Sequence, residues 1–182
     1  MARKLVEQRP IPLPPLPAGS ESSLGVMDLV YDDGSVRRLW TKYDGVQVLG
    51  LTPEGEVIAI RERGYTHLVG GFMEPGENPE AAARRELLEE TGYIAESIEL
   101  LAAPYQDSGG SERVIWLCLA SGCRKVQASE TGIGVTPMSP NEFWQHITSY
   151  IANPREKRRG IMSLAVAALA FQKLGLLTFN TP

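Results

Sequence analysis

Three glutamates close together in the sequence are the residues of this chain best suited to chemistry. Glu86, Glu89 and Glu90 stand near the end of a run of alanines and leucines that predicts a helix over residues 79–91. At about 100° per residue, the three carboxylates share an arc of about 100° on that helix. Carboxylate oxygens are the ligands that Mg²⁺ and Mn²⁺ prefer. The spacing therefore predicts a divalent metal site on one face of the helix.

Helix stability alone disfavours this arrangement. Glu86 and Glu90 form an i,i+4 pair of like charges, which weakens a helix by roughly 0.2–0.5 kcal/mol. The glutamates also lie toward the C-terminal end, where the helix dipole disfavours anions. A bound cation would reverse both effects. The alternative interpretation of the three glutamates is a solvated acidic face of the helix. The glycine-containing loop that begins at Gly70 and Gly71 favours the first reading, because a loop of this kind leading into an acidic helix suits a metal and a diphosphate.

Residues on either side of the acidic run define where the helix begins and ends. Asn78 is a favourable N-cap, and Pro79 is favoured at the first helical position. Gly92 is the residue expected to end the helix in a left-handed conformation. The sequence therefore places the carboxylates in the last two turns of a short, well-capped helix.

The whole stretch from Gly71 to Tyr93 fills every fixed position of the pattern G-x5-E-x7-R-E-U-x-E-E-x-G-U, where U is a bulky apolar residue. In this respect the chain resembles the Nudix hydrolases. The resemblance implies metal coordination by the carboxylates of Glu86, Glu89 and Glu90 and by the backbone carbonyl of Gly70 or Gly71. It also implies that Arg85 and Glu77 tie the loop to the helix.

The resemblance implies a catalytic set of Glu86, Glu89, Glu90, Arg85 and Glu130. A general base is needed to take a proton from the attacking water. Within the helix, Glu89 is the candidate. Among loop carboxylates, Glu112 and Glu130 are the candidates. Within the Nudix family, the chain resembles the branch that cleaves ADP-ribose and similar nucleoside diphosphate sugars, and that branch often uses a glutamate from the loop before its last strand.

Apolar runs separated by turn residues predict the remaining elements. The expected strands are 26–31 and 35–41 around an Asp-Gly turn, 46–52 and 57–63 around a second turn, 97–102, 113–120 and 132–138. Two further helices are expected over 140–149 and 154–174, each opened by a capping residue and a proline. Strands mixed with three helices fit an α/β fold, and the resemblance implies the Nudix-type α/β/α sandwich with a mixed β-sheet and an N-terminal β extension.

Residues 1–42 are expected to form an arm and residues 43–182 the Nudix hydrolase domain. The arm contains a proline-rich strip, residues 9–17, which predicts polyproline II structure. The similar branch commonly uses its N-terminal β region to form a domain-swapped homodimer, so the arm is a possible dimerisation region. The alternative is that residues 9–17 recruit a proline-recognition domain.

The resemblance implies hydrolysis of ADP-ribose or a nucleotide sugar to two monophosphates. The candidate substrate-binding residues are Arg61, Arg63, Ser108, Gly109 and Glu112. Arginine suits this role because its guanidinium can donate two parallel hydrogen bonds to the oxygens of a diphosphate. Ser108 stands where that branch tends to carry a proline, and this departure leaves two alternatives open: a housecleaning nucleoside triphosphate pyrophosphohydrolase and a non-catalytic ligand-sensing domain.

Composition limits the partners of the chain. With 182 residues and a net charge of −4, it has no basic footprint for nucleic acid. It contains no apolar run long enough for a membrane span and no signal-peptide core at its N-terminus. Its two cysteines, Cys118 and Cys123, allow a disulfide, but reduced thiols are expected. We therefore expect a cytoplasmic enzyme that uses Mg²⁺, or Mn²⁺, on a small nucleoside diphosphate derivative.

Overall fold

The computed structural model describes residues 4–11, 24–42, 44–62, 64–107, 111–130, 132–152 and 161–177. Its helices are α1 (Pro79–Thr91), α2 (Pro140–Ala152) and α3 (Ile161–Lys173). Its strands are β1 (Leu5–Ile11), β2 (Leu24–Tyr31), β3 (Val36–Lys42), β4 (Gly45–Leu51), β5 (Val57–Glu62), β6 (Tyr65–His67), β7 (Val69–Phe72), β8 (Tyr93–Ile94), β9 (Ser97–Ala102), β10 (Tyr105–Asp107), β11 (Ser111–Ser121), β12 (Arg124–Lys125) and β13 (Gly134–Met138). The chain divides into two compact units, Met1–Asp44 with Pro104–Ile115, and Gly45–Ala103 with Trp116–Pro182.

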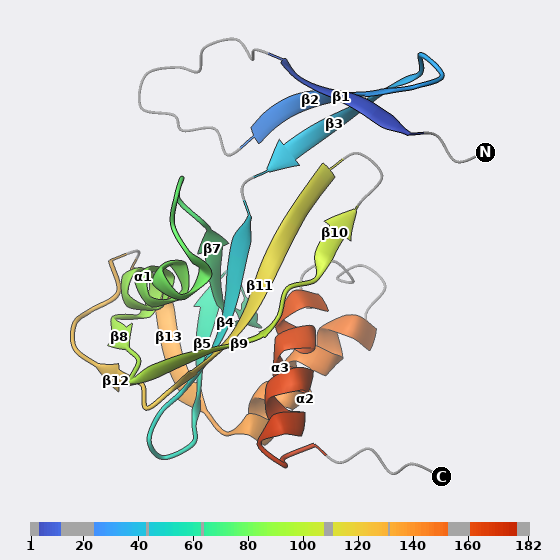
Figure 1. The fold of residues 1–182 in the computed structure, drawn as a ribbon. Coiled ribbons are helices and arrows are strands. Elements are labelled where there is room, and N and C mark those ends of the chain that lie inside the picture. Colours follow the sequence, from blue (N-terminus) through green and yellow to red (C-terminus); the bar gives the residue numbers. More distant parts are fainter. Residues whose placement is uncertain are drawn as a thin grey trace. The chain divides into compact units, whose positions relative to one another are not determined.

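The first unit is built on antiparallel strands. β2 pairs with β1 on one side and with β3 on the other, as Figure 1 shows. The predicted hairpin of β2 and β3 is confirmed, and its turn uses Gly34 at a φ of 78°. Arg38 on β3 holds Asp28 on β2 through two hydrogen bonds of 2.8 and 2.9 Å. β3 also pairs in parallel with the start of β11, which makes the sheet mixed.

The polyproline prediction is wrong for the residues of the strip that the structure describes. Arg9, Pro10 and Ile11 belong to β1 and pair with residues 26–28 of β2. β1 is an edge strand, and an edge strand tolerates proline because one of its backbone faces has no ladder partner. Residues 12–17 lie outside the described part of the chain.

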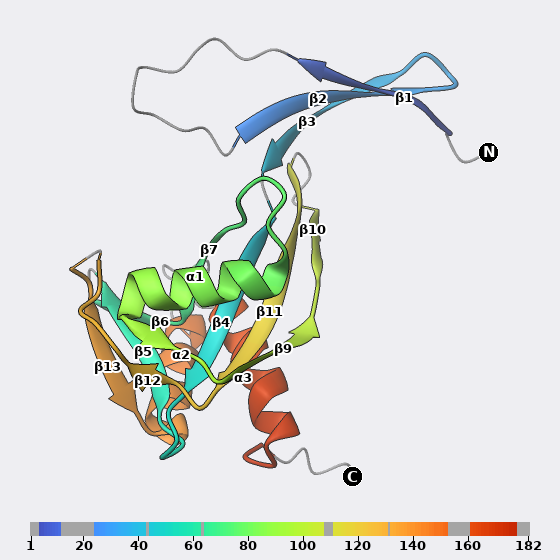
Figure 2. The same ribbon diagram turned by 60° about the vertical axis from the view of Figure 1, so that its left-hand side comes forward.

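The second unit is a sheet with helices on both faces. Its strands follow the order β11-β4-β5-β13; β9 pairs with β11, β7 with β4 and β6 with β5. Figures 1 and 2 show α1 on one face of this sheet and α2 with α3 on the other. The predicted α/β/α sandwich with a mixed sheet is therefore confirmed.

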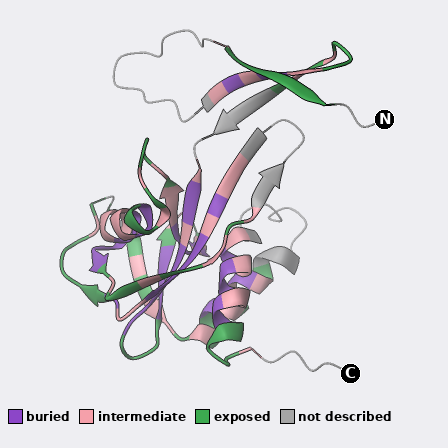
Figure 3. Ribbon diagram, in the orientation of Figure 1, coloured by how far each residue is buried: buried purple, intermediate pink, exposed green. Residues whose placement is uncertain are grey.

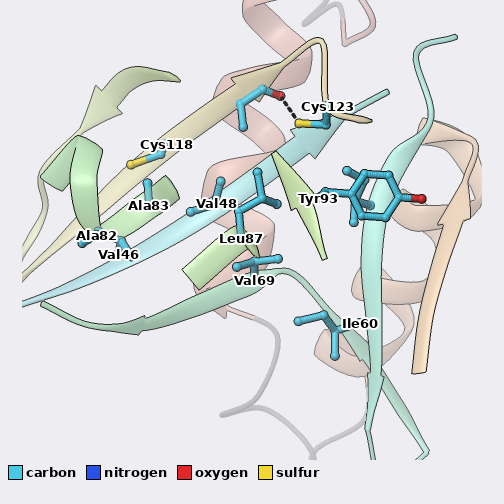
Figure 4. Close-up of a cluster of buried hydrophobic side chains, with 12 residues drawn as sticks. Val46, Val48, Ile60, Val69, Ala82, Ala83, Leu87, Tyr93, Cys118 and Cys123 are labelled. Carbon is cyan, nitrogen blue, oxygen red and sulfur yellow. Dashed lines mark hydrogen bonds between the residues drawn. The ribbon is translucent and has the colours of Figure 1, made fainter. Parts of the chain in front are cut away.

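The core lies on both faces of the central strands, where Figure 3 shows most of the buried residues. On the α1 face, Leu87 packs with Val48 and Val69 (Figure 4). The free thiols of Cys118 and Cys123 are buried in the same cluster. Burial raises the pKa of these thiols to about 12 and about 11, respectively, which makes them apolar filling rather than nucleophiles.

The helix predictions agree closely with the structure. α1 has the predicted bounds, and α2 extends to Ala152, a few residues beyond the predicted end. α3 is described from Ile161, so the predicted start of that helix, residues 154–160, lies outside the described residues. None of the described helices is long and apolar enough to cross a membrane.

Candidate active site

The acidic helix α1 begins and ends where its capping residues predict. Asn78 Oδ1 accepts a hydrogen bond of 2.9 Å from the backbone N–H of Ala81, and Pro79 follows as the first helical residue. At the other end, Gly92 has a φ of 75° and donates its N–H to Leu88 O at 2.7 Å. Strand β7 precedes this helix in the chain and pairs with β4. The loop between β7 and α1 therefore connects the sheet to the carboxylates.

Arg85 joins the loop, the strand and the helix through all five of its N–H groups. Nε and Nη2 each bond to one carboxylate oxygen of Glu77 at 3.0 Å. Nη1 donates to Glu86 at 2.8 Å and to Glu89 at 3.1 Å. The remaining Nη2 bond, 2.8 Å long, reaches the carbonyl of Phe72 at the end of β7. Because every donor is used, Arg85 positions the carboxylates rather than a substrate phosphate.

Two of the three predicted metal carboxylates face β7, with Glu86 buried and Glu90 half-buried. Glu86 is 8% exposed, and a Cβ placed on Gly71 would overlap its carboxylate. Glu90 Oε2 accepts the backbone N–H of Gly70 at 3.1 Å. Glu89 is more open, with a side chain 39% exposed. The helix therefore presents Glu86 and Glu90 to the two glycines that open the loop.

Burial changes the acidity of both inward-facing carboxyls. Desolvation raises the pKa of Glu86 above its usual range, against the opposing effect of Arg85. Desolvation also raises the pKa of Glu90 to about 7, and the negative charges of Glu86 and Glu62 add to this shift. Such a site favours a bound cation, because a positive charge would stabilise both carboxylates in their ionised form.

The predicted base Glu130 lies beside the end of this helix. Its backbone N–H donates to Glu89 O at 2.9 Å, which fixes the loop to α1. Its exposed side chain accepts a hydrogen bond of 3.1 Å from Gln127 Nε2. Gly92 makes this approach possible, since a Cβ there would overlap the carbonyl of Gln127.

The structure does not bring Arg61 to the acidic site. Arg61 and its neighbour Glu62 point to opposite faces of β5. Glu62 acts electrostatically on Glu90, whereas Arg61 lines a separate cavity of about 330 Å³ with His146 of α2.

The side chains of the other predicted substrate-binding residues lie outside the part of the chain that the structure describes. Arg63, Ser108 and Gly109 lie outside the described residues. Glu112 is described only in its backbone, which belongs to β11 in the first unit.

Comparison with known proteins assigns this chain to a family. The family model described as NUDIX domain matches residues 41–159. This chain belongs to the Nudix family. It is 33% identical over 125 residues to an ADP-ribose pyrophosphatase of Bacillus subtilis (strain 168), across 64% of this chain and 68% of that protein. The chain is accordingly a Nudix hydrolase.

Two further proteins are similar to this chain. The chain is 30% identical over 130 residues to a methanol dehydrogenase activator of Bacillus methanolicus, across 67% of this chain and 70% of that protein. A solved structure, "Crystal structure of ADP compounds hydrolase", matches 97% of this chain and 98% of its own with a TM-score of 0.65 at 16% identity. At that identity the likeness shows that the two proteins share a fold.

The residues of the Nudix helix fit a divalent cation. Three carboxylates, those of Glu77, Glu86 and Glu89, bind the guanidinium of Arg85, and a fourth, that of Glu90, binds the N–H of Gly70. Among the described residues, no three acidic, histidine or cysteine side chains form a ready-made metal cluster. Mg²⁺ is commonly held by one or two carboxylates and takes its other ligands from water and substrate phosphates.

The sequence did not reveal three polar residues that support the site, Gln47, Ser163 and Gln127. The first two hold the backbone before the Nudix loop, and Gln127 holds Glu130. A signal existed for Gln47, which is the one polar residue in the run Gly45–Leu51. Ser163 is likewise the one polar residue in the run of residues 161–171, whereas no such signal marks Gln127.

The pKa shifts predict how the stability of the metal-free protein depends on pH. A carboxyl with a raised pKa in the folded state contributes stability that is present below its unfolded value of about 4.5 and is lost as the pH rises through about 7. We expect the free energy of unfolding in EDTA to fall by about 1–2 kcal/mol between pH 5 and pH 8, after allowance for the solvent-exposed part of Glu90. Urea unfolding at both pH values measures this.

Added Mg²⁺ should reduce that loss, because the cation stabilises the ionised carboxylates. A metal-free protein equally stable or more stable at pH 8 would contradict the assignment. Glu77 and Glu142 do not confuse the test, because their pKa values are lowered and their contribution is lost only below about pH 5.

Proposed function

We propose that this Nudix hydrolase uses a divalent metal to cleave the diphosphate of ADP-ribose or a related nucleotide sugar into two monophosphates. The observation that carries the proposal is the close approach of the buried Glu86 to Gly71 and of the half-buried Glu90 to Gly70. Such a site carries an excess of negative charge that a cation would compensate. The similarity to an ADP-ribose pyrophosphatase supports the choice of substrate class.

In the proposed hydrolysis, each residue of the site has a separate role. A bound Mg²⁺ or Mn²⁺ would polarise the diphosphate and lower the pKa of a water. Glu86 and Glu90 would hold the cation, with Glu89 and the carbonyl of Gly70 or Gly71 as further ligands. Arg85 orients Glu86 and Glu89 through its hydrogen bonds.

We propose Glu130 as the base that takes the proton from the attacking water. Its carboxylate is exposed, and its loop is fixed to the Nudix helix. Glu89 is the alternative, but it already accepts a hydrogen bond from Arg85. A Glu130→Gln variant with unchanged turnover would transfer the role to Glu89.

The test is a hydrolysis screen in Mg²⁺ with ADP-ribose, nucleotide sugars, diadenosine polyphosphates and nucleoside triphosphates. A phosphatase added afterwards converts monophosphate products to free phosphate. We expect ADP-ribose or a nucleotide sugar to be cleaved fastest. Preference for a triphosphate would favour the housecleaning alternative, and no turnover with any compound would favour a ligand-sensing domain.

We also propose that the chain forms a homodimer through residues 1–42. In the first unit, Leu5, Val6 and Val36 are large apolar residues that are 40%, 58% and 56% exposed. A second copy would remove that surface from water. Sedimentation velocity of the full chain distinguishes a monomer of 19.9 kDa from a species of twice that mass, and a monomer at all concentrations would exclude the dimer.

A further inference from the structure

The backbone just before the Nudix loop is held by a side chain of the neighbouring strand. Gln47 lies on β4 opposite Gly70 of β7. Its Nε2 donates to the carbonyl of Leu68 at 3.0 Å and to the carbonyl of Val69 at 2.9 Å. One amide group therefore fixes two successive carbonyls immediately before Gly70.

The same segment is held from two other directions. The N–H of Leu68 donates to the hydroxyl of Ser163, which is 3% exposed on α3, at 3.3 Å. The N–H of Gly70 donates to Glu90 at 3.1 Å. Strand β4, helix α3 and helix α1 thus each bind one part of the segment, and rotation of its peptide groups is restricted.

The absence of a side chain at Gly70 allows β4 and the side chain of Gln47 to lie close to the backbone of β7. A Cβ at that position would lie 2.8 Å from the carbonyl of Val46 and 3.1 Å from Gln47 Nε2. The next carbonyl along the strand after the two that Gln47 holds is that of Gly70. Only the φ and ψ dihedrals of Gly70 separate its carbonyl from the peptide group that Gln47 holds at Val69, and the pairing of β7 with β4 restricts both.

We propose that Gln47 is a positioning residue of the metal site. By holding the carbonyls of Leu68 and Val69, it would orient the backbone of Gly70, whose carbonyl is a proposed metal ligand and whose N–H binds Glu90. This inference rests on the proposed metal-dependent function and extends it to a residue outside the Nudix motif. Groups that orient metal ligands typically affect metal affinity by about 10–100-fold.

The test measures metal binding without substrate. Gln47→Met keeps the length of the side chain and removes the donor, and Gln145→Leu, on the exposed side of α2, is the control. Titration with Mn²⁺, followed by electron paramagnetic resonance, should show about tenfold or weaker binding for Gln47→Met and no change for the control. Raising the Mg²⁺ concentration should restore most of the turnover, because the defect lies in affinity.

A second variant separates positioning from simple damage. Gln47→His keeps a ring N–H donor and should bind Mn²⁺ within about threefold of the original chain. Equal losses in the Met and His variants, or an unchanged affinity in the Met variant, would overturn the inference. The proposed function fails separately, if the unmodified chain binds no Mn²⁺ and hydrolyses none of the substrates.

Discussion

Glu90→Gln should lower kcat/KM for the preferred substrate by about 10³-fold, which corresponds to roughly 4 kcal/mol of transition-state stabilisation. The amide can still accept the N–H of Gly70, which Glu90 accepts at 3.1 Å, so the local backbone geometry has a partner in the variant. What the amide lacks is the negative charge that a divalent cation requires. The loss therefore reports metal coordination rather than folding.

The same variant should be more stable than the original chain when metal is absent. Desolvation raises the pKa of Glu90 to about 7, so at pH 8 the folded metal-free protein carries an unfavourable buried charge. Gln carries none. Thermal unfolding in EDTA at pH 8 should give a higher Tm for Glu90→Gln, whereas Mg²⁺ should raise the Tm of the original chain more than that of the variant.

Glu54→Gln is the matched control, because Glu54 is exposed in the turn between β4 and β5. The same chemical change there should leave activity and Tm unaltered. Activity of Glu90→Gln within tenfold of the original, with a circular dichroism spectrum that shows an intact fold, would remove Glu90 from the metal site.

The part of the site that the sequence predicted is the part formed by local interactions. The caps Asn78 and Gly92, the bounds of α1 and the grouping of its carboxylates all depend on residues within a few positions of each other. Helix periodicity and capping are local properties, so one sequence is enough to derive them. The hydrogen bond between the half-buried Glu90 and Gly70 could not be derived in this way, because it depends on how β7 packs beside the helix.

Strand alternation shows the other limit. It predicts correctly which residues of a strand share a face, but it does not say which face of the sheet a helix will cover. Arg61 was expected to reach the substrate, and the structure puts it in the cavity with His146. Gln47 was missed for a related reason: its contacts with Leu68 and Val69 form only when β4 and β7 pair in one register.

Gly71→Ala should produce the second large effect, a loss of about 10²-fold or more in kcat/KM together with about 1–3 kcal/mol of stability. A Cβ at residue 71 would overlap the carboxylate of Glu86. Glu86 is buried and held by Arg85, so it cannot move away without breaking that 2.8 Å hydrogen bond. A single methyl group should therefore displace a proposed metal ligand and strain the core at once.

Gly134→Ala provides the comparison that isolates this cause. Gly134 also lies in a strand of the second unit, but a Cβ there meets nothing closer than 3.5 Å. Its substitution should leave activity unchanged and stability equal or higher by about 0.4–1 kcal/mol, because alanine restricts the unfolded chain. If Gly71→Ala behaved like Gly134→Ala in urea unfolding, Mn²⁺ binding and hydrolysis, the close approach of Glu86 to β7 would not be required. The expected contrast would instead show that the glycine opening the Nudix motif is needed because a catalytic carboxylate occupies the space of its missing side chain.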